Sequence, residues 1–231
     1  MLRASYIKRQ FFYRSSKIKS QAIGKRPRRD TAANQAVMRQ NICDAALAIF
    51  RRHGFAAVSM RAVAQELGVS TMSTYNYFAS KDELFLEVRS RLFRQLSDYL
   101  SARAVSEDAE ERLEQVCRAY ISYGLTHGPE YELLFNAWQF DDYREVVGRF
   151  GPERLRDARP WDVMVDCVAG YLTSTASGAD PARTAHMVWA QMHGLLALHH
   201  AHKLVFGVNV QQLLQDSIPG IFRLVGSDAA R

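Results

Sequence analysis

Five histidines near the C-terminal end of the chain are the residues best suited to metal chemistry. His186, His193 and His200 recur every seven residues, and His199 and His202 form a pair three residues apart. Seven residues of helix rise about 10.5 Å, whereas a zinc–nitrogen bond is about 2 Å long, so the seven-spaced histidines cannot share one ion. The close pair has no cysteine or acid near it in the sequence. We therefore expect no metal and no cofactor.

The cysteines and the short motifs give no support to catalysis. Cys43, Cys117 and Cys167 lie far apart in apolar helical surroundings and form no CxxC pair, which predicts buried free thiols and a reducing cytoplasm. The chain also has no GxSxG nucleophile motif, no phosphate-binding glycine loop and no HExxH motif. The sequence therefore predicts a cytoplasmic protein that is not an enzyme.

Charge is unevenly distributed along the chain, whose formal net charge is +6. The first 29 residues contain ten basic residues and no acid, which leaves 20 basic against 24 acidic residues in the remainder. A basic arm on a mildly acidic body indicates a polyanionic partner, either nucleic acid or a membrane surface; a solvated tail is the other interpretation for residues 1–23. No apolar run reaches the ~18 residues of a membrane span, so no membrane segment is expected.

The segment from Thr71 to Phe78 carries a different chemistry. It is crowded with hydroxyl, amide and aromatic side chains and has almost no apolar face. A short helical pattern precedes it, beginning after Ser59 as N-cap and ending at Gly68. Two short helices joined by a glycine turn form a helix-turn-helix, whose second helix enters the major groove of double-stranded DNA. A mere connector helix is the alternative interpretation.

The elements that must position these groups are all helical. Strand signals are scarce, and helical periodicity covers most of the chain after residue 31, which predicts an all-α fold. Ser80 and Glu83 form a capping box at the start of one long helix, and Pro219 is expected to break or kink the last helix. The predicted helices span about 34–53, 61–67, 71–78, 81–104, 109–127, 129–140, 142–149, 160–176, 181–206 and 209–224.

The stretch AALAIFRRHGFAAVSMRAVAQELGVSTMSTYNYFASKDELF resembles, without a gap, the N-terminal DNA-binding domain of the TetR family of bacterial transcriptional regulators. Its carriers include Gly54-Phe55, Gly68-Val69-Ser70 and Tyr77-Phe78. The resemblance implies a basic extension at residues 1–30, a helix-turn-helix domain at residues 31–84, and a helical ligand-binding and dimerisation domain at residues 85–231.

The resemblance also implies which residues face the operator. These are Ser59, Arg61, Thr71, Met72, Ser73, Tyr75, Asn76, Tyr77 and Lys81. Tyr75 and Lys81 match the family pattern as phosphate contacts, and Asn76 can pair with adenine. Arg28 and Arg29 of the basic arm are expected along the minor groove. Thr74 departs from the family, which usually has an inward leucine at this position.

The remainder of the chain resembles the second domain of the family in outline. The segment VWAQMHGLLAL resembles the Trp-x-x-x-His-Gly motif of one subclass, with Trp189 and His193 on one helix face and Gly194 permitting close approach of another helix. The resemblance implies an inducer cavity among the central helices, although ordinary core is the alternative for each residue. The expected ligand contacts are Tyr120, Phe135, Trp138, Trp161, Met164, Trp189 and His193.

A twofold dimer follows from the family and from the spacing of DNA half-sites. The two recognition helices would lie roughly 34 Å apart on an inverted repeat. The expected interface residues are Leu195, Leu198, Val205, Leu213, Leu214 and Ile218. The resemblance thus implies a homodimeric repressor released from its operator by a small apolar or aromatic ligand. The alternative is an activator or architectural DNA-binding protein without an inducer.

Overall fold

The computed structural model of the chain describes residues 32–135, 143–151, 159–205, 207 and 209–227. The basic extension with Arg28 and Arg29, and the predicted ligand residue Trp138, lie outside the described residues. The described chain contains helices and no strand, which confirms the all-α prediction. The elements are α1 (Ala32–His53), the 3-10 helix η1 (Phe55–Ala57), α2 (Met60–Leu67), α3 (Thr71–Tyr75), α4 (Lys81–Ser101), α5 (Ala109–Thr126), α6 (Gly128–Phe135), α7 (Tyr143–Phe150), α8 (Arg159–Ser174), α9 (Pro181–His200) and α10 (Val210–Ser227).

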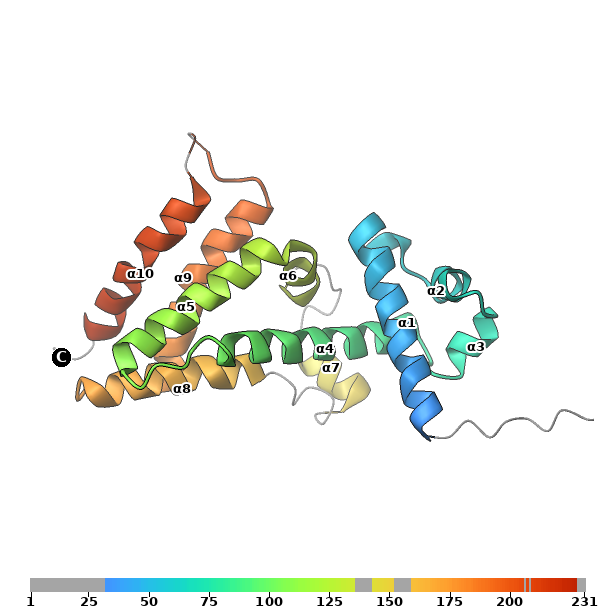
Figure 1. The fold of residues 1–231 in the computed structure, drawn as a ribbon, viewed down its shortest axis with the longest axis horizontal. Coiled ribbons are helices and arrows are strands. Elements are labelled where there is room, and N and C mark those ends of the chain that lie inside the picture. Colours follow the sequence, from blue (N-terminus) through green and yellow to red (C-terminus); the bar gives the residue numbers. More distant parts are fainter. Residues whose placement is uncertain (1–31, 136–142, 152–158, 206, 208, 228–231) are drawn as a thin grey trace, which may run out of the picture.

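The helices form two groups joined by α4 (Figure 1). Helices α1, α2 and α3 make a small group at one end, and α5, α8, α9 and α10 pack together at the other. Helix α4 packs against α1 at its start and against α5 and α8 further along. One continuous helix therefore connects the predicted DNA-binding part with the larger bundle.

Predicted caps define the short helices. The Ser59 hydroxyl accepts from the Ala62 amide at 3.1 Å, and the Ser70 hydroxyl accepts from the Ser73 amide at 3.1 Å. Gly68, between these two helices, has a φ of 66°, in the left-handed region that glycine adopts without strain. These contacts confirm that the two helices and the turn between them are fixed by local sequence.

The start of α4 also follows its predicted capping box. The Ser80 hydroxyl accepts from the Glu83 amide at 3.1 Å, and the Glu83 carboxylate reaches back to the Ala79 amide at 2.8 Å. Helix α4 then buries a row of apolar residues from Leu84 to Leu100. The capping box thus fixes the residue at which α4 begins, and with it the face of α4 that packs against both groups of helices.

Helix α9 is shorter than the sequence predicts, since it ends at His200 and not near residue 206. The amide of Lys203 donates to the Leu198 carbonyl at 2.8 Å, and the amide of His202 donates to the His199 carbonyl at 3.0 Å. His202 takes a left-handed φ of 53°, so these bonds close the helix with a turn. Val205 consequently lies beyond the helix and is exposed.

Helix α10 runs through Pro219 without a break, so of the predicted break or kink at that position the break does not occur. Proline removes one backbone N–H from the helix interior. The apolar face of α10 is nevertheless buried at Leu214, Ile218, Ile221 and Val225. Packing of this face against the bundle therefore offsets the missing hydrogen bond.

The close helix contact in the bundle occurs at a different glycine from the one predicted. Gly194 has no atom within 4 Å of the position that a Cβ would take. A Cβ at Gly124 of α5 would lie 2.6 Å from the Leu196 side chain of α9. Gly124, therefore, lets α5 and α9 approach, and Gly194 faces open space.

Candidate DNA-binding surface and ligand pocket

Helix α3 is held from one side and exposed on the other. Thr74 and Phe78 are both 0% exposed, and the Thr74 hydroxyl donates to the Thr71 carbonyl at 2.8 Å. On the outer side, Met72 is 71% exposed and Tyr75 is 48% exposed, and Asn76 is also exposed. These three side chains are therefore accessible to a partner.

The end of α3 is fixed by a residue that sequence reasoning missed. The helix has five residues, so Asn76 and Tyr77 belong to the following turn. Arg39 of α1 donates to the Tyr77 carbonyl, and its guanidinium lies 4.1 Å from the centroid of the Phe78 ring. No local pattern marks Arg39 for this role, because its partners are 38 residues away.

Two of the predicted hydroxyls are already engaged within the chain. Ser59 caps α2, and the hydroxyls of Ser70 and Ser73 lie 2.8 Å apart. Arg61, in the first turn of α2, is exposed, and Thr71 is half-buried. The side chains that reach outward from this surface are therefore those of Arg61, Met72, Tyr75 and Asn76.

Lys81 is half-buried and its ammonium is hydrogen-bonded within the chain. Its ammonium donates to the Phe55 carbonyl at 3.0 Å and lies 4.1 Å from the centroid of the Phe55 ring. Burial lowers the pKa of this lysine, and the neighbouring carboxylate of Asp82 partly opposes the shift. In this structure Lys81 joins the start of α4 to η1, which the prediction of a phosphate contact did not foresee.

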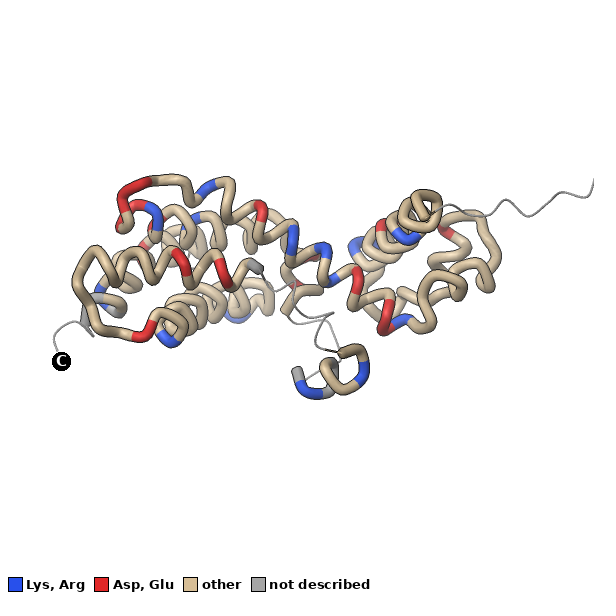
Figure 2. Tube along the Cα trace, turned by 90° about the horizontal axis from the view of Figure 1, so that it is seen from below, with Lys and Arg blue, Asp and Glu red and all other residues tan. Residues whose placement is uncertain are grey.

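The described residues carry charges of both signs in both groups of helices (Figure 2). The concentration of positive charge in the sequence is the arm before residue 30, outside the described residues. Sequence-independent attraction to DNA would therefore come mainly from that arm.

A cavity of about 570 Å³ lies in the larger bundle. Side chains from α4, α5, α6, α8 and α9 line it, namely Phe93, Leu96, Leu100, Tyr120, Phe135, Pro160, Trp161, Met164, His186 and Trp189. The volume is within the range of small-molecule sites, about 300–1,000 Å³. Nearly all of the lining is aromatic or aliphatic, as expected for an apolar ligand.

A chain of buried polar groups runs behind one wall of this pocket. The Trp189 indole N–H donates to the Tyr120 hydroxyl at 2.9 Å, and the hydroxyls of Tyr120 and Tyr131 lie 3.1 Å apart. The Tyr131 hydroxyl contacts Nδ1 of His193. Burial raises the pKa of Tyr120 to about 12 and lowers the pKa of His193. The network is therefore uncharged near neutral pH.

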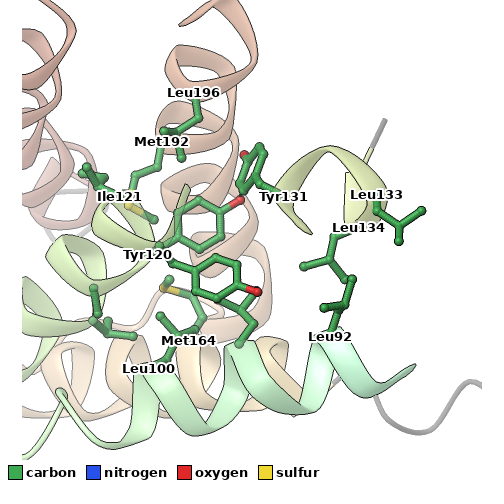
Figure 3. Close-up of a cluster of buried hydrophobic side chains, with 14 of the residues drawn as sticks. Leu92, Leu100, Tyr120, Ile121, Tyr131, Leu133, Leu134, Met164, Met192 and Leu196 are labelled. Carbon is green, nitrogen blue, oxygen red and sulfur yellow. The ribbon is translucent and has the colours of Figure 1, made fainter. Parts of the chain in front are cut away.

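The close-up shows where this network sits in the bundle. Tyr120 and Tyr131 lie between α9, which carries Met192 and Leu196, and α4, which carries Leu92 and Leu100 (Figure 3). The rings of Trp189 and His193 stack with centroids 4.9 Å apart, which confirms that these two residues touch on one helix face. His193 therefore supports the wall of the pocket from behind and is not a lining residue.

The structure brings together most of the predicted ligand residues. Tyr120, Phe135, Trp161, Met164 and Trp189 all line the cavity. Sequence reasoning missed the lining residues Phe93, Leu96, Leu100, Pro160 and His186. Leu96 and Leu100 belong to the apolar stripe of α4, and a stripe alone does not show which part of the core is hollow.

The predicted interface residues divide into two groups. Leu198 is 42% exposed, and Leu195 and Leu213 are half-buried beside the open space at Gly194. Leu214 and Ile218 are 0% and 3% exposed, so they pack into the core of their own protomer. The two buried residues are removed from the predicted interface, because a partner cannot reach them.

No metal site and no membrane span is found among the residues that the structure describes. In that part of the chain, no three His, Cys, Asp or Glu residues are placed to share a metal ion. Within the same residues, no helix is both long and apolar enough to cross a bilayer. The three cysteines are free and buried, as predicted.

Two family descriptions match the chain in succession. Residues 42–88 match "Bacterial regulatory proteins, tetR family", and residues 113–219 match "Tetracyclin repressor-like, C-terminal domain". The first match contains α2, α3 and the start of α4, and the second covers α6, α8, α9 and most of α5, which line the pocket together with α4. Both parts of the fold are thus assigned by similarity to one kind of protein.

Individual relatives agree with this assignment. The HTH-type transcriptional repressor KstR of Rhodococcus jostii (strain RHA1) is 26% identical over 190 residues, which are 73% of this chain and 88% of KstR. A protein of unknown function from Rhodococcus sp. RHA1 has the same fold, with a TM-score of 0.65, 21% identity, and coverage of 80% of this chain and 94% of that one. A TetR-family transcriptional regulator from Pectobacterium atrosepticum aligns with a TM-score of 0.60 and 20% identity, over 87% of this chain and 98% of that one. Together with the two family matches, these similarities show that the chain belongs to the TetR family of bacterial transcriptional regulators.

Proposed function

We propose that the protein is a homodimeric repressor that binds an inverted-repeat operator through α3 and is released by a small apolar or aromatic ligand. The proposed division is a basic arm at residues 1–30, a DNA-binding domain at residues 31–84 and a ligand-binding and dimerisation domain at residues 85–231. Such a regulator would act in the bacterial cytoplasm, where its operator is.

The observation that carries the proposal is the arrangement of α3. Thr74 of α3 and Phe78 after it are buried in the small core, while Met72 and Tyr75 of α3 and Asn76 in the following turn are exposed. This is the arrangement that a recognition helix needs, since base edges are read by exposed side chains on a fixed helix. Tyr75 offers a hydroxyl to phosphate, and Asn76 offers an amide to adenine.

The geometry of α4 supports ligand control. Its first residue, Lys81, is bonded to the Phe55 carbonyl in the DNA-binding part, and Leu96 and Leu100 of the same helix line the pocket. A ligand that presses on these leucines would shift the position of α4 against α1. Coupling between two sites of this kind is typically worth ~1–3 kcal/mol.

The dimer is proposed to form over the surface shared by α9 and α10. Leu195, Leu198 and Leu213 lie there beside Gly194, which has open space where a side chain would be. A twofold axis at this surface would present two copies of α3 to one face of the DNA. Two half-sites about one helical turn apart, roughly 34 Å, would then be read together.

The test is selection of binding sites from a random duplex library with the full-length protein. Salt of about 150 mM suppresses binding that depends on phosphates alone. We expect an enriched inverted repeat. Loss of the enriched motif in Asn76→Ala, with unchanged selection by Val105→Ala, would support reading through α3. Val105 is a suitable control because it is 69% exposed and lies in the connection between α4 and α5, at the far end of α4 from α3. Binding without any enriched motif would contradict the proposal.

A further inference from the structure

We infer that the pocket takes an uncharged ligand with a planar aromatic or polycyclic skeleton and rejects the same skeleton when it carries an anionic group. The inference rests on the proposed function, because it takes this cavity to be the ligand site. It goes further by specifying the charge and the shape of the ligand. The argument starts from the polar atoms that surround the cavity.

No charged side chain lines the cavity among the residues that the structure describes. The lining consists of five aromatic rings, five other side chains of which three are aliphatic, and no Asp, Glu, Lys or Arg. The five rings belong to Phe93, Tyr120, Phe135, Trp161 and Trp189. Aromatic walls favour a planar ligand, because offset stacking adds to the burial of apolar area.

The hydrogen-bonding groups at the inner end of the pocket already satisfy one another. The indole N–H of Trp189 is the only donor of that side chain, and it is used by the Tyr120 hydroxyl at 2.9 Å. The Tyr120 hydroxyl is in turn 3.1 Å from that of Tyr131, which contacts His193. An anionic group placed beside Tyr120 and Trp189 would lose its hydration and would find the donors of these two side chains already used.

One cation, Arg89, lies next to the cavity wall at Phe93. Its Nε–H donates to the Leu134 carbonyl at 3.1 Å, and its guanidinium lies 5.1 Å from the centroid of the Phe93 ring. Burial lowers the pKa of Arg89 to about 10, so the side chain stays cationic at neutral pH. Arg89 is not a lining residue, and the Phe93 ring presents an apolar surface to the ligand.

The mouth of the pocket also consists of rings. The centroids of Trp161 and His186 are 4.0 Å apart, and His186 is exposed. Nδ1 of His186 donates to the Ala182 carbonyl at 2.8 Å, so in the neutral ring Nε2 is an acceptor. An acceptor at the mouth gives no attraction to an anion.

Two dyes with one skeleton test the inference. N-Phenyl-1-naphthylamine is uncharged, and 1-anilinonaphthalene-8-sulfonate is the same molecule with one sulfonate. Both fluoresce more strongly in apolar surroundings. Titration of the full-length protein with each dye at about pH 8, above the ordinary pKa of histidine, should give at least about tenfold tighter binding of the neutral dye. Equal affinity, or preference for the sulfonate, overturns the inference.

Location of the dye is tested by two matched variants. Met164 lines the pocket and is 3% exposed, whereas Met187 is 38% exposed on α9. We expect Met164→Trp to fill the cavity and abolish binding of the neutral dye, and Met187→Trp to leave it unchanged. If Met164→Trp does not fold, energy transfer from tryptophan to the bound dye locates the dye. We expect less transfer in Trp161→Phe and in Trp189→Phe than in the unmodified protein. Equal transfer would overturn the location of the dye in the pocket.

These outcomes separate the inference from the proposed function. If the neutral dye binds as expected but leaves operator affinity unchanged, the ligand class stands and release of the operator by occupancy of the pocket is contradicted. If neither dye binds while an operator is still selected, DNA recognition stands and the inference is overturned.

Discussion

Arg51 at the end of α1 and Glu130 at the start of α6 form an ion pair that joins the small group of helices α1–α3 to the larger bundle. Nε of Arg51 lies 2.7 Å from the Glu130 carboxylate. The arginine side chain is 49% exposed, whereas that of the glutamate is only 9% exposed. The residue after Glu130 is Tyr131, whose hydroxyl belongs to the polar network behind the pocket. Two consecutive residues of α6 thus contact Arg51 of α1 and the polar network behind the pocket.

The unequal burial of this pair predicts unequal effects of removing its members. Arg51→Gln leaves a buried carboxylate without its cation, which costs about 3–5 kcal/mol for a fully buried pair; because Arg51 is half exposed, we expect about 2 kcal/mol. Glu130→Gln leaves an arginine that water can reach, and we expect about 1 kcal/mol or less. Urea unfolding measures the loss of unfolding free energy in each variant. A larger loss for Glu130→Gln than for Arg51→Gln would contradict the prediction.

Lys81 and Arg61 are expected to affect DNA binding in different ways. The Lys81 ammonium is bonded to the Phe55 carbonyl, so Lys81→Ala should lower the melting temperature without changing the salt dependence of operator binding. Arg61 is exposed, so Arg61→Ala should keep the melting temperature and lower the slope of log K against log salt by about 0.9 for one lost phosphate contact. A reduced slope for Lys81→Ala would restore its predicted role as a phosphate contact.

Thr74 occupies a fully buried position with a hydroxyl that bonds only to its own helix. We expect Thr74→Leu to raise the stability of the protein by about 1 kcal/mol, because it buries additional apolar surface. Thr74→Val, which has nearly the same size as threonine, is the matched control for loss of the hydroxyl. Thermal melts in which Val stabilises and Leu destabilises would show that the site has no room for the larger side chain.

The buried His193 should make stability depend on pH. Burial lowers its pKa in the folded protein below the value of about 6.5 in an unfolded chain. The unfolded state therefore binds the proton first, and the stability present above about pH 6.5 is lost as the pH falls from there. The pKa of His199 is also lowered. Because His199 is present in every variant compared, its contribution does not distinguish them.

Urea midpoints between about pH 7.5 and about pH 5.5 measure this dependence. His193→Gln, which keeps an acceptor for Tyr131, should show a smaller loss of stability on acidification than the unmodified protein. His53→Gln is the control, since His53 is exposed. Equal losses in His193→Gln and the unmodified protein would mean that His193 does not contribute to the pH dependence.

Features that depend on neighbouring residues were predictable from the sequence. Ser59, Ser70 and Ser80 each cap the helix that follows them, and Gly68 takes the left-handed turn. The hydrogen-bond partners of these groups lie within three or four residues along the chain. The spacing of residue types in the sequence is therefore enough to predict these contacts. The helix-turn-helix and the exposure of α3 follow from such local patterns.

Features that depend on distant partners were not predictable in the same way. The Phe55 carbonyl that binds Lys81 lies 26 residues away, and Glu130 lies 79 residues from Arg51. Leu214 and Ile218 illustrate a related limit, because an apolar stripe shows that a helix face is covered but not by which chain. The structure answers that question for these two residues, which its own protomer buries.

The division of α3 into anchored and exposed positions has a consequence for how this regulator can change over evolution. Thr74 and Phe78 hold the helix, whereas Met72, Tyr75 and Asn76 contribute little to the core. Under the proposed function, substitutions at the three outer positions after gene duplication would alter the preferred operator while the domain continues to fold. A duplicated copy could therefore acquire a new set of target genes without first acquiring a new fold.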